Sequence, residues 1–244
     1  MGLILSTSAQ AAWGQYLKKQ LFLADSLFKI QKYPEALDIY NDVLNKSNQF
    51  SPQMLMKMAY IKDGMGDYTG ALYHLNLLYY YNPDQQVLLQ MEEIASRYNL
   101  QGYSFTDLEY FMFLYNEYYQ YLIWAFIAFS GMAFVYLVIK KYRKLPLGFR
   151  PMVFIILLAL AFLFTNFEMI PQKGIIKNRT YLMSGASPGA DRFTTVDEGH
   201  RVTILGKQDV WYLILWEGKT TYIQENNLLV IGEQSKKSIF SYFF

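Results

Sequence analysis

Few side chains in this chain could carry chemistry. It has no cysteine and two histidines, His74 and His200, with no His or Glu partner at the spacing of a metal site. A nucleophile with a neighbouring base, a P-loop and a glycine-rich phosphate cradle are also missing from the sequence. We interpret both histidines as structural or surface residues, and we expect a protein that is not an enzyme and binds no metal or cofactor. The net charge of +2, without a basic stripe, argues against a nucleic-acid partner.

Two segments are apolar enough to cross a membrane. Residues 121–139 carry no charge, and 19 residues at 1.5 Å per residue span roughly 28 Å, close to the hydrocarbon thickness of a bilayer. Residues 151–170 form the second predicted span, which is shorter and begins at Pro151. Together they predict a transmembrane hairpin.

The connecting loop, residues 140–150, sets the predicted topology. It contains no acidic residue, and its basic residues are Lys140, Lys141, Arg143, Lys144 and Arg150. Basic loops stay in the cytoplasm, and tyrosine and tryptophan gather where a helix enters the membrane, as Tyr121 and Trp124 do here. Both ends of the chain are therefore expected outside the cytoplasm.

Two interpretations are open for the N-terminal segment, residues 1–15. Residues 2–11 are similar to the end of a secretory signal peptide, with Ala9-Gln10-Ala11 as the small-x-small cleavage pattern. The other reading is a frayed apolar N-terminus.

A repeat lies within residues 16–118. Residues 35 positions apart match, and the pairs are Tyr33 with Tyr68, Ala36 with Ala71, Leu37 with Leu72 and Ala24 with Ala59. A period near 34, made of two helices, is typical of tetratricopeptide repeats. A third, degenerate unit places Tyr103 at the position of Tyr68, and the helix from residue 106 is expected to run directly into the first span.

Such repeats bind a peptide or a partner helix on the face made by the first helix of each unit. The repeat register predicts that this face contains Lys18, Leu21, Asp25, Phe28, Gln53, Met56, Tyr60 and Asp63. The alternative is that these side chains only solvate the groove or pack on a neighbouring helix.

After the second span the pattern changes to strands. Runs at 202–205, 211–216 and 220–223 with a turn at Glu217-Gly218-Lys219 predict a small barrel. Residues 178–232 resemble a bacterial SH3 domain, although the family's Gly-Trp pair after the turn is Thr221-Tyr222 here. The candidate groove aromatics are Trp211, Tyr212 and Tyr222; the alternative is that they form the barrel core. The aromatic tail, residues 233–244, is interpreted as a docking or interfacial segment.

The predicted fold class is multidomain: an all-α tetratricopeptide-repeat domain, two transmembrane helices in a hairpin, and a small all-β SH3-like barrel. This order resembles the BatE-type members of the Bat (Bacteroides aerotolerance) family. The resemblance implies a protein of the bacterial inner membrane with both soluble domains in the periplasm, and partners among Bat proteins with von Willebrand A domains and, indirectly, a MoxR-type ATPase. The expected function is a non-enzymatic scaffold; the alternative is a module that binds peptidoglycan or senses the envelope.

Overall fold

The computed structural model describes residues 2–47, 50–104, 107–143, 156, 158 and 172–232. The chain divides into two compact units. The first joins Met1–Ser104 to Gln172–Phe244, and the second is Phe105–Pro171. The helical repeats and the strands therefore belong to one unit, although residues 105–171 separate them in the sequence.

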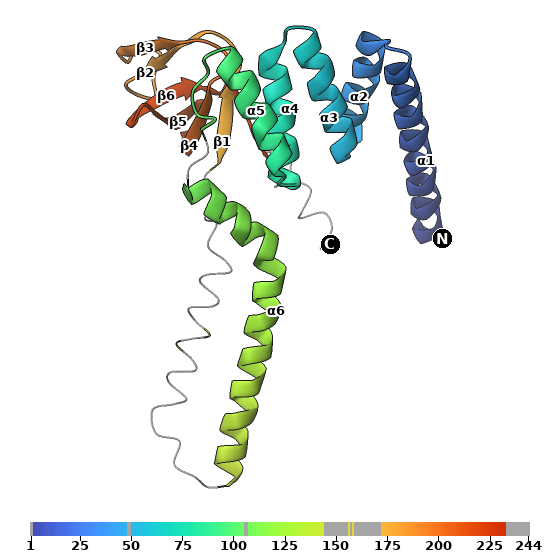
Figure 1. The fold of residues 1–244 in the computed structure, drawn as a ribbon, viewed down its shortest axis with the longest axis vertical. Coiled ribbons are helices and arrows are strands. Elements are labelled where there is room, and N and C mark those ends of the chain that lie inside the picture. Colours follow the sequence, from blue (N-terminus) through green and yellow to red (C-terminus); the bar gives the residue numbers. More distant parts are fainter. Residues whose placement is uncertain are drawn as a thin grey trace. The chain divides into compact units, whose positions relative to one another are not determined.

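Five helices make up the helical part of the first unit. Figure 1 shows them side by side in chain order, with the strands next to α4 and α5. Their bounds are α1 (Gly2–Lys29), α2 (Tyr33–Ser47), α3 (Pro52–Gly64), α4 (Tyr68–Tyr81) and α5 (Gln85–Arg97). The packed neighbours include α1 with α2, α3 with α4, and α4 with α5. Residues 2–15 are the first part of α1, which continues without a break into the repeat.

Side-chain caps fix where three of these helices begin. The Ser51 hydroxyl accepts a hydrogen bond from the Met54 amide at 3.1 Å, and Pro52 occupies the first helical position of α3. Asp67 and Asp84 cap α4 and α5 in the same way. Each carboxylate accepts a hydrogen bond of 2.8 Å from a backbone amide in the first turn of its helix. Such caps satisfy amides that have no partner inside the helix.

The same chain reversal ends α1, α3 and α5. A residue with positive φ follows each helix: Gln31 (62°), Gly66 (81°) and Asn99 (53°). Its amide donates to the carbonyl three residues back, and the next amide donates to the carbonyl five residues back. This left-handed C-terminal cap defines the repeat at the level of the backbone.

These caps correct the register predicted for the third unit. Gly66 follows Gln31 by 35 residues, but Asn99 follows Gly66 by 33. Gln101, and not Tyr103, is therefore the counterpart of Tyr68. The next helix starts only at Asp107, so the third unit has a first helix in α5 and no second helix directly after the turn.

The alanines of the predicted repeat lie in the helical core. Ala24, Ala36 and Ala71 have no exposed surface and Ala59 has 3%. Leu55 of α3 and Leu72 of α4 are completely buried as well. Small residues let paired helices approach closely, which explains why these positions repeat.

Among the residues of the second unit that the structure describes, Asp107–Tyr142 form one long helix, α6. Its segment Tyr118–Tyr142 is long and apolar enough to cross a membrane, and none of that stretch is buried. It is the one such helix in the described part of the chain. As predicted, the helix that starts near residue 106 continues without interruption into the apolar segment.

Part of the predicted hairpin lies outside the described residues. This applies to the second predicted span, residues 151–170, apart from Ile156 and Leu158, and to Lys144 and Arg150 of the basic loop. Lys140 and Lys141 lie in the last turn of α6, and the Arg143 amide donates to the Ile139 carbonyl at 2.9 Å just beyond it. The tail, residues 233–244, also lies outside the described residues.

The strands form one antiparallel sheet in the order β3-β2-β6-β5-β4-β1-β7. Their bounds are β1 (Lys173–Ile176), β2 (Thr180–Met183), β3 (Arg192–Val196), β4 (Arg201–Gln208), β5 (Trp211–Trp216), β6 (Lys219–Gln224) and β7 (Leu228–Val230), with a short 3-10 helix, η1 (Glu225–Asn227), before β7. The predicted turn joins β5 to β6, with φ of 48° at Glu217 and 77° at Gly218. Strand β1, which pairs with β4 and β7, starts before the predicted boundary at residue 178.

Candidate binding surfaces

The predicted repeat face contains a cluster of three aromatic rings. Phe28 at the end of α1 lies 5.4 Å from Tyr33 and 5.9 Å from Tyr60 of α3, and Tyr33 lies 6.0 Å from Tyr60, each measured between ring centroids. All three pairs meet edge to face, a favourable geometry for aromatic rings. Tyr60 remains 59% exposed, so the cluster presents an aromatic surface to solvent.

Asp25 joins three helices beneath this cluster. Its carboxylate forms an ion pair with Lys57 of α3 at 2.7 Å and accepts a hydrogen bond from the hydroxyl of Tyr40, which is completely buried in α2. Burial alone would raise the pKa of Asp25, but the hydrogen bonds from Lys57 and Tyr40 outweigh it and hold this pKa below its ordinary value. Burial, followed by the hydrogen bond to Asp25, raises the pKa of the Tyr40 hydroxyl. Asp25 therefore links α1 to α2 and α3 through its Oδ1 atom.

Asp63 makes the corresponding link to the next unit. Its carboxylate lies 3.3 Å from the guanidinium of Arg97 on α5, which also pairs with Glu93 at 3.2 Å. The first helices of the three units, α1, α3 and α5, are thus cross-linked along one face by ion pairs.

The structure brings half of the predicted face together. Asp25, Phe28, Tyr60 and Asp63 take part in these contacts. The other four predicted residues take no part in these ring contacts and ion pairs. Leu21 and Met56 are half-buried, and Lys18 and Gln53 are exposed. Three residues that make these contacts were not predicted for this face: Lys57, Arg97 and Tyr33, which was identified only as a repeat position.

The three candidate aromatics of the barrel fall on opposite faces of the sheet. Tyr212 is 4% exposed and belongs to the core with Ile214 and Trp216. Trp211 pairs with Gln224, two residues from Tyr222, so Trp211 and Tyr222 share the other face. Trp211 is buried, whereas Tyr222 is half-buried. Of the three, Tyr222 is the one with substantial exposed surface.

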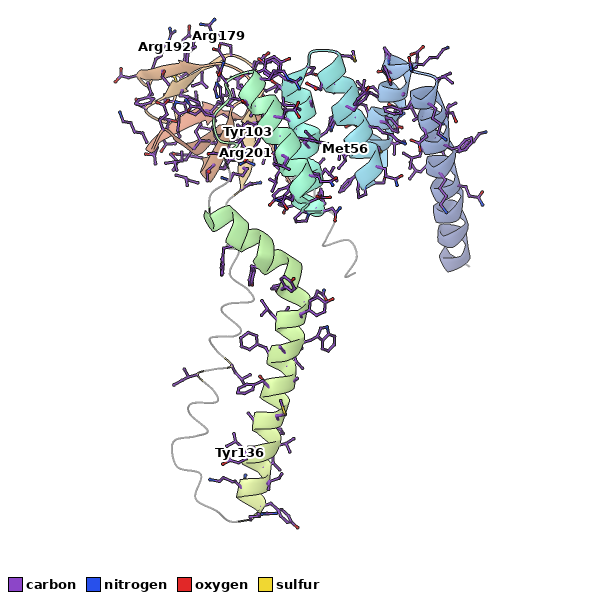
Figure 2. The ribbon with its side chains drawn as sticks, in the orientation of Figure 1. Met56, Tyr103, Tyr136, Arg179, Arg192 and Arg201 are labelled. Carbon is purple, nitrogen blue, oxygen red and sulfur yellow. The ribbon has the colours of Figure 1, made fainter. Side chains whose placement is uncertain are left out.

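The barrel packs on the repeats through a buried arginine. Arg201 at the start of β4 is 8% exposed, and its Nε donates to the Gly102 carbonyl at 2.6 Å. Its Nη1 donates to Oδ1 of Asn76, itself buried in α4, at 3.2 Å, and its guanidinium lies 5.0 Å from the ring centroid of Tyr103. Figure 2 shows Arg201 and Tyr103 next to each other where the strands meet the helices. These contacts satisfy hydrogen-bonding groups of both parts in an interface closed to water.

The chain between α5 and α6 forms the other side of this junction. We call residues Gln101–Tyr103 the strap. The Gln101 carbonyl accepts from the Arg201 amide at 3.0 Å, and the Tyr103 hydroxyl donates to the Gly199 carbonyl at 2.8 Å. Burial raises the pKa of Tyr103, so its hydroxyl stays protonated.

Two glycines make this close approach feasible. A Cβ on Gly102 would lie 2.0 Å from the Arg201 carbonyl oxygen, and a Cβ on Gly199 would lie 2.8 Å from the ring of Tyr68. Both have positive φ, 88° and 89°, which glycine adopts without strain. The close packing at the junction therefore depends on a glycine in each of the two parts.

An open hollow lies at the edge of the junction. It is lined by Tyr68, Tyr98, Asn99, Leu100, Arg179, Asp197, Glu198 and His200. The rings of Tyr68 and Tyr98 stack with centroids 4.2 Å apart, and the Tyr68 hydroxyl donates to Glu198 at 3.3 Å. Burial, followed by the charge of Glu198, raises the pKa of Tyr68. Arg179 pairs with Asp197 at the rim at 3.3 Å.

The two histidines have different surroundings. His74 is buried within α4, where burial lowers its pKa to about 4 and no described group hydrogen-bonds to Nδ1. His200 lies in the junction, where Nδ1 accepts from the Gln101 amide at 2.9 Å. Neither belongs to a group of three or more His, Asp or Glu residues that could hold a metal ion, as judged over the described residues.

Comparison with known proteins bears on the barrel. A search of curated proteins returns no match. Residues 178–228 match the family model described as a bacterial SH3 domain. This match agrees with the observed antiparallel sheet, so the C-terminal part of the chain contains a bacterial SH3 domain.

Proposed function

We propose that this chain is a membrane-anchored adaptor that acts by binding other proteins and performs no catalytic step. The observation that carries the proposal is the aromatic cluster of Phe28, Tyr33 and Tyr60 on the face that α1 and α3 share. Exposed aromatic side chains supported by a rigid scaffold are typical anchors of protein interfaces. The ion pairs Asp25–Lys57 and Asp63–Arg97 hold the helices that carry the cluster.

The proposed location is the bacterial inner membrane. Helix α6 would provide the first span and residues 151–170 the second, with the basic loop in the cytoplasm. Two features of α6 support this orientation. Tyr121 and Trp124, which are 72% and 66% exposed, lie toward one end of the apolar segment, and Lys140 and Lys141 lie at the other. The helical repeats and the SH3 domain would then face the periplasm.

The proposed partners are proteins of a Bat-type system. The order of helical repeats, apolar helix and bacterial SH3 domain resembles BatE-type proteins. This resemblance suggests von Willebrand A-domain Bat proteins as direct partners and a MoxR-type ATPase as an indirect one. Assembly at the inner membrane under envelope or oxidative stress is the role we infer.

A pull-down from membranes solubilised in mild detergent tests the adaptor role. The wild-type chain should recover a von Willebrand A-domain protein, and Tyr60→Glu should lose it because the substitution places a charge in the aromatic cluster. The matched control is Tyr181→Glu, which changes a tyrosine of similar exposure (49%) on the barrel. Loss of the partner in the Tyr181 variant alone would place the binding site on the barrel, and recovery with both variants would contradict our assignment of the repeat face.

A second candidate function is binding of peptidoglycan. It is favoured by the bacterial SH3 match and by the exposed aromatic rings of Tyr181 and Phe193 on β2 and β3. Co-sedimentation of the detergent-solubilised chain with purified sacculi tests it. Sedimentation that Tyr181→Glu abolishes and Tyr60→Glu preserves would support this function over the first.

A further inference from the structure

One histidine links the strap to the barrel as a hydrogen-bond acceptor. The Gln101 amide donates to Nδ1 of His200 at 2.9 Å. A ring nitrogen can accept a hydrogen bond only when it carries no proton, so the imidazole is neutral here and has its hydrogen on Nε2. Protonation would turn Nδ1 into a donor that faces the donor amide of Gln101.

This contact starts a continuous row of bonds between the strap and the barrel. Gln101 also accepts from the Arg201 amide, Gly102 accepts from the Arg201 side chain at 2.6 Å, and Tyr103 donates to the Gly199 carbonyl. Residues 199–201 and 101–103 thus pair along their length. Repulsion at Gln101 acts on the first bond of this row and on the backbone that positions the others.

We propose that His200 is a pH-sensitive latch that holds the SH3 domain on the helical repeats while its ring is neutral and weakens the junction when the ring is protonated. The inference concerns the junction alone and does not depend on the adaptor role.

The surroundings of His200 determine the direction of the effect. Asp197 and Glu217 favour the protonated ring, but burial favours the neutral ring more strongly, so the pKa of His200 lies below its ordinary value. The other groups around it are the edge-on ring of Trp216 at 5.2 Å, Glu198 bonded to Tyr68, and Arg179 paired with Asp197. None of these other groups supplies an acceptor to Nδ1 in place of the Gln101 amide.

Proton linkage determines whether docking becomes weaker or stronger as pH falls. The docked state binds fewer protons than an undocked state in which an exposed histidine has its ordinary pKa of about 6.5. The contribution of His200 to docking is complete above that pKa and is lost as pH falls through the lower pKa of the docked state. Between the two values the docking equilibrium weakens by up to about tenfold per pH unit.

Because the chain has two histidines, a pH effect at the junction can be assigned to one of them. His74 is the only other histidine in the sequence, and its pKa of about 4 keeps it neutral at pH 5.5. Aspartate and glutamate side chains ordinarily titrate near 4. A change between pH 7.5 and 5.5 can therefore be assigned to His200.

Hydrogen–deuterium exchange on the full chain in detergent micelles tests the latch. Exchange of the strap amides, above all the hydrogen-bonded amide of Gln101, is compared at pH 7.5 and 5.5 after correction for the intrinsic rate. We expect protection of the strap in the wild type to fall at pH 5.5, by at most about tenfold, while amides of β5 keep theirs. The matched variant is His200→Asn, whose Oδ1 can occupy the Nδ1 position and accept at every pH, so its strap protection should not depend on pH.

Equal protection of the wild-type strap at both pH values would overturn the proposal, as would the same loss in the Asn variant. A measurement on the wild type alone guards against a variant that does not fold. The chain has two histidine Cε1–H signals in an NMR titration, and a His200 pKa at or above 6.5 would also overturn it.

Discussion

Replacement of Arg201 by leucine tests how strongly the junction joins the two parts of the first unit. The change removes two hydrogen bonds from a charged donor, to Gly102 and to Asn76, and a contact with the ring of Tyr103. It also leaves the Asn76 Oδ1 buried without this partner, while the apolar stem of the side chain is largely preserved.

The expected cost is large for a single substitution. Each hydrogen bond from a charged donor contributes about 1.5–3 kcal/mol, and the contact with the aromatic ring contributes about 2 kcal/mol when desolvated. The variant also avoids the free-energy cost of burying a charged guanidinium, and this gain offsets part of the lost stability. We therefore expect Arg201→Leu to reduce the free energy of unfolding of the first unit by about 3 kcal/mol.

Arg192→Leu is the matched control. Its guanidinium also lies over a tyrosine, 4.3 Å from the ring centroid of Tyr181, but both side chains are on the exposed surface. Exposed cation–π contacts contribute about 0.5–1 kcal/mol, so this variant should lose less than about 1 kcal/mol.

Urea unfolding of both variants in detergent micelles, followed by near-ultraviolet circular dichroism, provides the comparison. A double-mutant cycle with Asn76→Ala should give a coupling energy of about 1–2 kcal/mol between the two side chains. An Arg201 variant no less stable than the Arg192 variant, or a coupling energy near zero, would refute the view that the junction stabilises the unit.

Three further predictions follow from the structure, and a fourth from the proposed topology. Gln31→Gly should stabilise the protein by about 1 kcal/mol in urea unfolding, because glycine adopts the φ of 62° at this exposed position without strain. Gly102→Ala should destabilise it by about 3 kcal/mol or more, because the new Cβ would lie 2.0 Å from a carbonyl oxygen and φ is 88°. Asp25→Asn should cost about 1 kcal/mol at pH 7; since the pKa of Asp25 is lowered in the folded state, that loss should disappear as pH falls below the ordinary value of 3.8. In this cysteine-free chain, Leu147→Cys should resist and Ser187→Cys should react with a membrane-impermeant maleimide added to spheroplasts, and the reverse pattern would contradict the proposed topology.

Local patterns predicted much of the fold. The apolar run from Trp211 to Trp216 coincides with β5, and the Glu217-Gly218 turn joins the next strand as expected. The alanines of the repeat are buried, as expected for small residues that recur where two helices pack closely. These features depend on neighbours in sequence, so a single sequence contains the information.

Features that depend on distant partners were missed. Arg201 contacts Asn76 across 125 residues and Gly102 across 99, and no periodic pattern indicates such pairs. The four residues of β1 are too few to distinguish from a loop, and they pair with β4 and β7, which come later in the chain.

The hydrogen bond of His200 and the register of the third repeat were not predicted from the sequence, for related reasons. A lone histidine is usually structural, and the amide that it accepts from belongs to residue 101. The register of the third unit depends on Asn99 with φ of 53°, because asparagine replaces glycine in the left-handed cap and hides the match.

The proposed adaptor role requires that the aromatic cluster around Tyr60 binds a protein partner. Site-specific photocrosslinking in intact cells tests it most directly, with p-benzoylphenylalanine at position 60 and, as a control, at the exposed position 38 on α2. Our account predicts a discrete crosslinked species from position 60 that contains a von Willebrand A-domain protein and is absent from position 38. Crosslinks that are absent from position 60, or equal at the two positions, would contradict it.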